Sequence, residues 1–455
     1  MNNKKSVYKW IAVIFLALFF VAVFVAFLER ARHRQKELLV IWGQTASNLG
    51  ENLVDCRLWL FDPETQQAST PIIQEKRWCG YGVVYVDGKQ RLSEIIPDGQ
   101  IVLYNITSQQ TIEVWQTIDL KTQVMGSPPQ WGQDGSIYFS GEWGEDGQEQ
   151  IYRFDSQTGT TTSFILFEPG LAADPLIAPD GNYLVYWTLD GPINRLPTVC
   201  GLGCVGYYHI YNLQTQADVE LFPLLAPLVE EPLPHCSAQW APTGRYLAFN
   251  IGGCGDWGAR DLVVFDADES RIVALFEAAA EEVNFIFEGW FSNSELVYQR
   301  KQRSPELGSW VDTFWVYSLE EKTSRELVES PAASEQLSRT QNLDWTPDRR
   351  FILGTNYAAT PPALIIVDAS QESQRIDYFS YEDDFSNKPR WLPFRRPQLS
   401  PSGDWIAYYT SFREREEEGG SITNVYIVNR VSKDVVSLDT TNIVVNLNYV
   451  WVQGQ

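Results

Sequence analysis

Residues 178–186 read Ala-Pro-Asp-Gly-Asn-Tyr-Leu-Val-Tyr, a tight-turn sequence followed by an apolar strand sequence. Proline presets the backbone for the first turn position, and glycine supplies the positive φ that such a turn often needs. The apolar run is short enough for a buried strand. The same half-motif, usually led by tryptophan, recurs at residues 131–139, 240–249, 290–298, 345–353 and 399–408.

A second half-motif consists of a strand, a polar turn and another strand, as in Ile151-Tyr-Arg-Phe-Asp-Ser-Gln-Thr-Gly159. Asp or Asn usually stands at the strand end, where its side chain can bond the turn backbone. Copies of this hairpin begin at Leu58, Ile101, Ile151, Tyr208, Leu262, Phe314, Leu364 and Val425. A period of roughly 50 residues with four strands per unit is typical of β-propeller blades.

The sequence therefore predicts an all-β fold, a propeller of eight four-stranded blades. Seven blades is the alternative, because the unit between Trp78 and Trp115 is the least regular. The segment 447–452 looks like the first strand of a blade, and 38–42 looks like the second. We expect these two ends of the domain to pair and close the ring, which would remove two exposed sheet edges.

These repeats resemble the TolB-type, WD40-like (PD40) propeller repeat, which reads W-S-P-D-G, an apolar strand, and then I-Y-x-x-D-x-x-T-G. The resemblance covers almost everything after residue 38. Two copies depart from it: 290–294 lacks the proline and glycine, and Arg349 replaces the glycine after Asp348. The resemblance implies a propeller. It does not select an activity, since such repeats occur in periplasmic interaction modules and in non-catalytic domains of some serine peptidases.

The charge of the chain is strongly asymmetric. The first 36 residues hold seven basic residues and one acidic residue out of 35 and 58 in the chain, so the remainder carries a net charge of −29. Such a surface repels phosphate backbones, and we predict no nucleic-acid partner. The charge also serves solubility, and an affinity for basic partners is the alternative reading.

Residues 10–28 form an uncharged apolar stretch long enough for a helix to cross a membrane. No small-residue cleavage pattern follows it, so we predict an uncleaved signal anchor. The resulting domain organisation is a short tail at 1–9, a transmembrane anchor at 10–28, a juxtamembrane linker at 29–37 and a propeller domain at 38–455. Residues 223–234 contain four prolines and predict a stiff, extended connection within that domain.

Basic residues flank both ends of the apolar stretch, so the positive-inside rule does not fix the orientation. The six cysteines favour export, because an even number is typical of exported proteins with disulfides. We therefore predict a single-pass membrane protein with an extracytoplasmic propeller. The candidate disulfide cysteines are Cys56, Cys79, Cys200, Cys204, Cys236 and Cys254.

Several pairings of these cysteines are reasonable. Cys236 and Cys254 lie on the two arms of one predicted hairpin, which suits a cross-strand or loop-end disulfide. Cys200 with Cys204 could close a short loop, and Cys56 with Cys79 could tie two blades. Free thiols, or a zinc site with the nearby histidines, are the alternatives; the spacing matches no standard zinc signature.

The chain contains no recognisable catalytic, cofactor or metal motif. Residues 201–206 fit G-x-G-x-x-G, but a strand sequence follows where a nucleotide-binding helix should begin. No G-x-S-x-G elbow or H-E-x-x-H motif occurs. His209 stands in a strand sequence, where a packed histidine is the ordinary interpretation. We predict no catalytic residue, no cofactor and no bound metal.

The segment 391–397 combines aromatic and basic residues on an acidic protein, a composition enriched at binding hot spots. We predict a binding loop here, with candidate residues Trp391, Phe394, Arg395 and Arg396, against the alternative of an ordinary loop between blades. The predicted function is a non-catalytic module that binds a protein or peptide, or acts as a scaffold, at the membrane. The alternative is a propeller hydrolase or lyase with carboxylates in its central channel.

Overall fold

The computed structural model describes most of the chain after residue 36. The described ranges are 37–45, 54–69, 72–76, 85–86, 91–96, 100–106, 112–119, 123–124, 130–143, 148–165, 170–190, 207–226, 235–252, 260–278, 283–303, 310–328, 337, 341–356, 363–369, 376–380, 391–413, 421–438 and 443–453. The predicted anchor at 10–28 and the G-x-G-x-x-G segment lie outside them. Within these ranges, no helix has the length and hydropathy needed to cross a membrane.

The described strands form eight antiparallel sheets, each with four strand positions. From the centre outward, the first sheet consists of β34 (Ile443–Gln453), β1 (Glu37–Thr45), β2 (Val54–Asp62) and then β3 (Gln67–Ala68) with β4 (Ile72–Lys76), and the second of β5 (Tyr85–Val86), β6 (Arg91–Ile96), β7 (Gln100–Ile106) and β8 (Ile112–Asp119). The third sheet consists of β9 (Gln123–Val124) with β10 (Gln130–Trp131), then β11 (Ser136–Trp143), β12 (Gln148–Asp155) and β13 (Thr160–Ile165). The fourth consists of β14 (Gly170–Ile177), β15 (Tyr183–Asp190), β16 (Tyr207–Asn212) and β17 (Asp218–Glu220).

The other four sheets, in the same order, are β18 (His235–Trp240), β19 (Tyr246–Gly252), β20 (Arg260–Asp266), β21 (Arg271–Phe276); β22 (Val283–Trp290), β23 (Glu295–Arg303), β24 (Trp310–Ser318), β25 (Thr323–Glu326); β26 (Gln341–Trp345), β27 (Phe351–Asn356), β28 (Ala363–Asp368), β29 (Ile376–Ser380); and β30 (Trp391–Leu399), β31 (Trp405–Arg413), β32 (Ser421–Asn429), β33 (Val435–Leu438).

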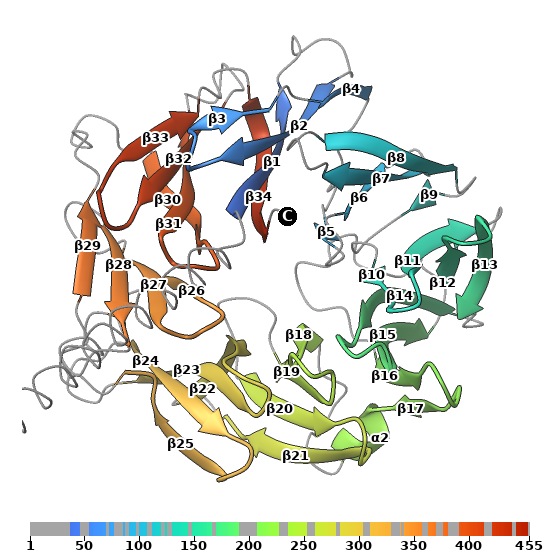
Figure 1. Cartoon of the computed structure of the whole chain (residues 1–455). Coiled ribbons are helices and arrows are strands. Elements are labelled where there is room, and N and C mark those ends of the chain that lie inside the picture. The colour runs from blue at the N-terminus through green and yellow to red at the C-terminus, as the bar shows by residue number, and fades with distance from the viewer. Residues whose placement is uncertain are drawn as a thin grey trace, which may run out of the picture.

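The sheets are arranged around a common centre, with the first strand of each innermost and the last strand outside (Figure 1). The all-β architecture of repeated four-stranded sheets, predicted from the two half-motifs, is confirmed. Strand β34 pairs with β1 over most of its length, from Glu37 opposite Gln453 to Thr45 opposite Ile443. The last described strand therefore completes the first sheet.

The Pro-x-Gly half-motif forms the turn between the first and second strands of a sheet. In the copy at 178–183, the Gly181 N–H donates to the Ala178 carbonyl at 2.8 Å, and the Ala178 N–H donates to the Tyr183 carbonyl at 2.8 Å. Gly181 has φ +71°, a conformation that glycine adopts without steric cost. Arg349 occupies the corresponding place with φ +60°. Turn geometry, more than residue type, is therefore what the repeat preserves.

Neighbouring sheets pack face to face, which buries many strands on both sides. All six residues of β28 are buried, and so are all six of β27. One core cluster joins Phe351 and Leu364 to Ile406 and Tyr408 of the next sheet. Strands buried on both faces read as continuous apolar runs rather than as alternating ones, which explains the short apolar segments in the sequence.

The recurrent tryptophans at the ends of inner strands link adjacent sheets. The indole N–H of Trp290 donates to the Gln239 carbonyl at 2.9 Å, and that of Trp240 donates to the Leu176 carbonyl at 3.0 Å. Each ring thus satisfies its polar atom on the inner strand of the preceding sheet. Trp451 makes the same kind of contact with Gln398 at 3.4 Å, so the C-terminal strand follows the pattern of the internal repeats.

The prediction of an extended connection after Pro223 is wrong at its beginning. Residues Phe222–Leu225 form a short helix, α2. Pro223 is compatible with this helix because the first turn of a helix needs no backbone donor from that position. Leu221 and Leu225 bury their side chains against the core formed with β19 and β20.

Candidate functional site

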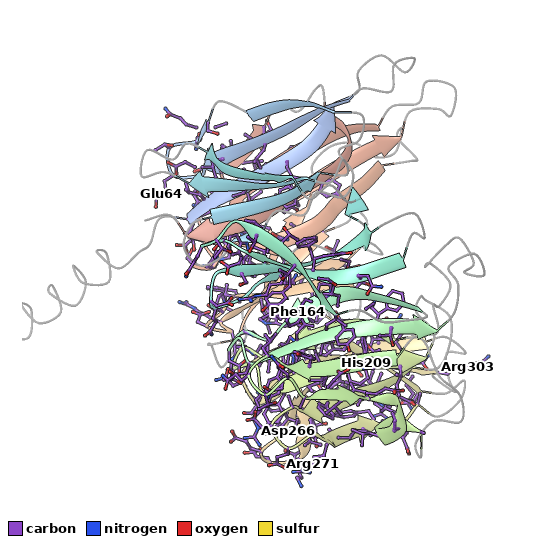
Figure 2. The ribbon with its side chains drawn as sticks, turned by 90° about the vertical axis from the view of Figure 1, so that its right-hand side faces the viewer. Glu64, Phe164, His209, Asp266, Arg271 and Arg303 are labelled. Atoms are coloured by element: carbon purple, nitrogen blue, oxygen red, sulfur yellow. The ribbon has the colours of Figure 1, made fainter. Side chains whose placement is uncertain are left out.

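The two rims of the propeller are built differently. We call the rim that carries the Pro-x-Gly turns and the turns after the third strands the turn rim, and the opposite rim the far rim. Figure 2 shows Glu64, Asp266 and Arg271 on one side of the molecule, at the turn rim, and Arg303 on the other. At the far rim, the strand ends are joined by segments such as 191–206 and 414–420, which lie outside the described residues.

The turns after the third strands are capped by their own side chains, as predicted for Asp or Asn at these strand ends. The Asn212 side-chain oxygen accepts hydrogen bonds from the Gln214 and Thr215 N–H groups, both at 2.9 Å. Asp155 makes the same contacts with Gln157 and Thr158 at 2.8 and 3.1 Å. These backbone donors lower the pKa of the Asp155 carboxyl.

Six arginines of the turn rim are paired with acidic side chains. Arg245 contacts Asp266 at 2.7 Å, and the Asp266 carboxylate is almost fully buried. Arg349 contacts Glu295 at 2.9 Å, and Arg350 contacts Asp368 at 3.3 Å. The further pairs at this rim are Arg153–Asp134, Arg271–Glu269 and Arg325–Glu295. Charges of this rim are therefore largely used within the molecule.

Successive turns of this rim also touch one another. The Gln133 side-chain amide donates to the Pro179 carbonyl at 2.9 Å. A Cβ atom at Gly244 would lie 2.5 Å from the Asp180 carboxyl carbon, and one at Gly403 would lie 2.4 Å from the Phe351 ring. The turn rim is thus a tightly packed, internally bonded surface.

The far-rim end of the β23–β24 hairpin has the opposite character. Within the part of the chain that the structure describes, Arg300, Lys301 and Arg303 make no ion pair, although the six turn-rim arginines named above all do. Arg303 is exposed, and the Arg300 Nε atom is buried without a hydrogen-bond partner. Val311, which pairs in register with Gln302, is one of four exposed large hydrophobic residues among the described residues.

Two carboxyl groups lie close to these cations. Burial raises the pKa of Glu288 to about 7, against the opposing influence of Lys301 and with a further contribution from Asp312. Burial also raises the pKa of Asp312, which pairs in register with Lys301, and its Oδ1 atom has no hydrogen-bond partner. Glu288 stands at an irregular position between Phe287 and Gly289, where β22 holds one residue more than β23.

A hydroxyl–imidazole–carboxylate series crosses the sheet of β14 to β17. The Thr188 hydroxyl lies 3.1 Å from His209 Nε2, and His209 Nδ1 lies 3.2 Å from the Asp218 carboxylate. Tyr186 donates to the same carboxylate at 2.8 Å and stacks on the imidazole with ring centroids 4.9 Å apart. The order resembles a catalytic triad. Thr188 is fully buried, so its hydroxyl cannot meet a substrate, and the series acts as a packed support.

The acidic residues of the inner strands interact with different partners. The Asp174 carboxylate accepts a hydrogen bond from the Trp187 indole. Asp344 accepts one from the Leu399 N–H at 2.7 Å, and burial raises its pKa to about 6. Glu288 interacts with Lys301 and Asp312 of its own sheet. No group of three metal-ligating side chains occurs among the described residues.

The segment predicted as a binding loop is a strand. Trp391, Phe394, Arg395 and Arg396 all belong to β30, the inner strand of its sheet, and Trp391 begins this strand at the far rim. Prolines 393 and 397 are tolerated because β30 pairs with β31 alone and its register shifts on both sides of Arg395. A role of these residues in binding stays a prediction.

Of the candidate disulfide cysteines, Cys56 in β2 and Cys236 in β18 lie in described strands; Cys79, Cys200, Cys204 and Cys254 lie outside the described residues. Asn250 stands opposite Cys236, and Cys254 follows the end of β19 at Gly252. The register therefore excludes the directly cross-strand form of a Cys236–Cys254 disulfide. A loop-end form stays a prediction.

The sequence interpretation did not single out Arg300, Lys301 and Arg303. The signal was present, because the run Gln-Arg-Lys-Gln-Arg at 299–303 ends an apolar strand in a strongly acidic domain. It could not be interpreted without knowing which rim the strand end reaches, since arginines of the turn rim are paired with acids.

No protein-family model matches the sequence, and the curated proteins contain no similar sequence. Solved structures share the fold. Dipeptidyl peptidase 4 from Porphyromonas gingivalis aligns with a TM-score of 0.51 and 10% identity, over 79% of this chain and 53% of the peptidase. This chain thus spans about half the length of that peptidase, and a likeness at this identity concerns the fold alone.

TolB and WD40 propellers are also among the similar structures, as the repeats predicted. TolB from Acinetobacter baumannii aligns with a TM-score of 0.35 and 11% identity, over 90% of this chain and 82% of TolB. The β-propeller domain of Cps50 from Myceliophteria thermophila aligns with a TM-score of 0.39 and 10% identity, over 71% of this chain and 91% of that domain.

Proposed function

We propose that the protein is a membrane-anchored, extracytoplasmic propeller of eight blades that binds a protein or peptide on its far rim without catalysing a reaction. In this proposal, the pairing of β34 with β1 closes the ring. Propellers present their loops around a rigid frame, which suits recognition of protein segments.

The observation that carries this proposal is the difference between the two rims. At the turn rim, the Arg245–Asp266 and Arg349–Glu295 pairs and the capped turns use polar groups internally. At the far rim, Arg300, Lys301 and Arg303 have no ion-pair partner among the described residues. Exposed apolar side chains occur at both rims, Val311 beside these cations and Val431 and Val435 at the turn rim. A surface that already satisfies its polar groups gains little from a partner, whereas unpaired charges beside exposed apolar surface gain more.

The position of the predicted anchor also supports the far rim as the binding face. Strand β1 begins at Glu37, and Glu37 contacts Ser402 in a turn of the turn rim. Residues 29–36 between the anchor and Glu37 reach at most about 28 Å when extended. The turn rim would therefore face the membrane, and the far rim would face the aqueous compartment.

Site-specific photo-crosslinking of the full chain in its own membranes tests this function. A photoreactive amino acid at Val311 probes the far rim, and the same amino acid at the exposed Glu64 is the matched turn-rim control. We expect one protein adduct from position 311 and none from position 64. Adducts from neither position, or from position 64 alone, would contradict the proposal. Digestion by protease added outside intact cells tests the extracytoplasmic location.

An enzyme with channel carboxylates is the second candidate. The observation in its favour is that burial raises the pKa of Glu288 to about 7 and of Asp344 to about 6, on neighbouring inner strands. Perturbed carboxyl groups are enriched at catalytic sites. The hydrogen bond from Leu399 to Asp344 gives that carboxyl a packing role instead. A hydrolytic or lyase activity abolished by Glu288→Gln would favour the enzyme.

A further inference from the structure

We infer that the far-rim end of the β23–β24 hairpin docks an acidic, partly apolar segment of a partner protein, with Arg300, Lys301 and Arg303 as the charged contacts and Val311 as the apolar contact. This inference rests on the proposed function and specifies the partner's chemistry. We call these four residues the basic hairpin end.

The charge of the domain makes these three cations exceptional. The domain after residue 36 carries a net charge of −29, so an acidic segment is repelled by most of the surface. The turn rim does not attract such a segment through these arginines, since Arg245, Arg349 and Arg350 are paired with Asp266, Glu295 and Asp368. The basic hairpin end makes no ion pair with any described residue, which leaves its charges for a partner's carboxylates.

The Arg300 side chain is not saturated with hydrogen bonds. Its Nε atom is buried and has no hydrogen-bond partner among the described residues. A buried donor without an acceptor is costly in a folded protein and calls for an explanation. Arg300 as a whole is half-buried, so a partner's Asp or Glu would bind its terminal nitrogens rather than the buried Nε atom.

The nearby acids weaken the positive charge without cancelling it. Lys301 stands opposite Asp312 and interacts with Glu288, so two carboxyl groups offset part of the charge of three cations. Burial raises the pKa of both carboxyl groups, and that of Glu288 reaches about 7, which reduces the negative charge of Glu288 near neutrality. Among the described residues, the three cations outnumber these two carboxyl groups.

An exposed apolar side chain lies beside the cations. Val311 is 37% exposed and pairs with Gln302, so it lies on the same face of the sheet as Gln302 and Arg300, whereas Lys301 and Arg303 point to the opposite face. A segment with both acidic and apolar side chains that crosses the strand ends would therefore meet Val311 and Arg300 on one face and Arg303 on the other.

The test uses the full chain in detergent micelles and a fluorescent peptide of alternating Glu and Leu residues, with the Gln-for-Glu peptide as a control. We expect the acidic peptide to bind, and the binding to weaken as salt rises. Arg303→Glu should weaken it by about tenfold or more. Arg271→Glu makes the same charge change at an exposed turn-rim site and should leave binding within about twofold.

Equal binding by the wild type and Arg303→Glu would overturn the inference, and so would an equal loss in Arg271→Glu or stronger binding of the Gln peptide. Arg300→Gln is a second variant, which should also weaken binding if the fold is intact by circular dichroism. The proposed function fails separately: an adduct from position 311 that Arg303→Glu leaves unchanged refutes the acidic partner but keeps the far-rim binding face.

Discussion

The Ser402 hydroxyl donates a hydrogen bond to Oε2 of Glu37 at 2.8 Å and joins the first residue of β1 to the turn between β30 and β31. The Ser402 N–H donates to the other carboxylate oxygen. This contact fixes where the chain enters the propeller, at the turn rim. In the proposed membrane-anchored arrangement, the turn rim would therefore face the membrane.

Two glycine positions separate the cost of turn conformation from the cost of packing. Gly159 and Gly403 have φ +69° and +74°, but only Gly403 faces a neighbour, at 2.4 Å from the Phe351 ring. Gly159→Ala should lower the free energy of unfolding by about 1–2 kcal/mol through backbone strain alone. Gly403→Ala should lower the free energy of unfolding by roughly 1–3 kcal/mol more than Gly159→Ala does, because the added methyl group overpacks the rim. Equal decreases in the free energy of unfolding, measured by chemical denaturation, would contradict this packing of the rim.

Asn250 links two sheets through a buried side chain. Its amide nitrogen donates to the Phe285 carbonyl at 2.8 Å, and its oxygen accepts from the Phe287 N–H at 2.8 Å. Asn250→Asp would aim a carboxylate at that carbonyl and should cost about 3–5 kcal/mol of stability. Asn212→Asp is the matched control, because only the side-chain oxygen caps that turn, and should change stability by about 0.5 kcal/mol or less.

The Glu288 carboxyl should make stability depend on pH. Burial raises its pKa to about 7 in the folded protein, from 4.5. The folded state then binds more protons than the unfolded state between these values, so its contribution to stability is lost as pH rises from about 4.5 to about 7. Glu288→Gln should stabilise the protein at pH 8 by on the order of 2–3 kcal/mol and flatten this pH dependence.

Thermal unfolding of both proteins at several pH values measures this effect. Asp312→Asn should act in the same direction, because burial also raises the pKa of Asp312. A wild type that gains stability between pH 5 and 7 relative to Glu288→Gln would refute the assignment.

The repeat pattern predicted the arrangement of strands and turns because the residues that form each turn lie within its half-motif. A glycine or an equivalent residue such as Arg349 in the left-handed region makes the first turn, and Asn212 or Asp155 caps the second. These interactions join residues that are close in the sequence, so the sequence pattern predicts them. The copy at 290–294 illustrates the limit: without Pro or Gly, its turn is held by the Ser292 hydroxyl, which accepts from the Ser294 and Glu295 N–H groups.

The sequence was less informative about the inner strands and the site. The segment 391–397, predicted as a binding loop from its aromatic and basic residues, lies in β30, which accommodates Pro393 and Pro397 through two register shifts on an inner strand with one partner. The unpaired charge of Arg303 depends on which acids lie nearby in space, and no local pattern encodes that. The same holds for the Thr188–His209–Asp218 series, whose members come from three strands.

The proposed binding face depends most directly on which rim would face the membrane. Energy transfer from a fluorescent amino acid to labelled lipid headgroups, in full-length protein reconstituted into nanodiscs, measures this. The fluorophore is placed at Glu64 on the turn rim in one variant and at Arg303 on the far rim in another. We predict more efficient transfer from position 64. Equal transfer from both positions, or stronger transfer from position 303, would contradict the orientation and the far rim as the binding face.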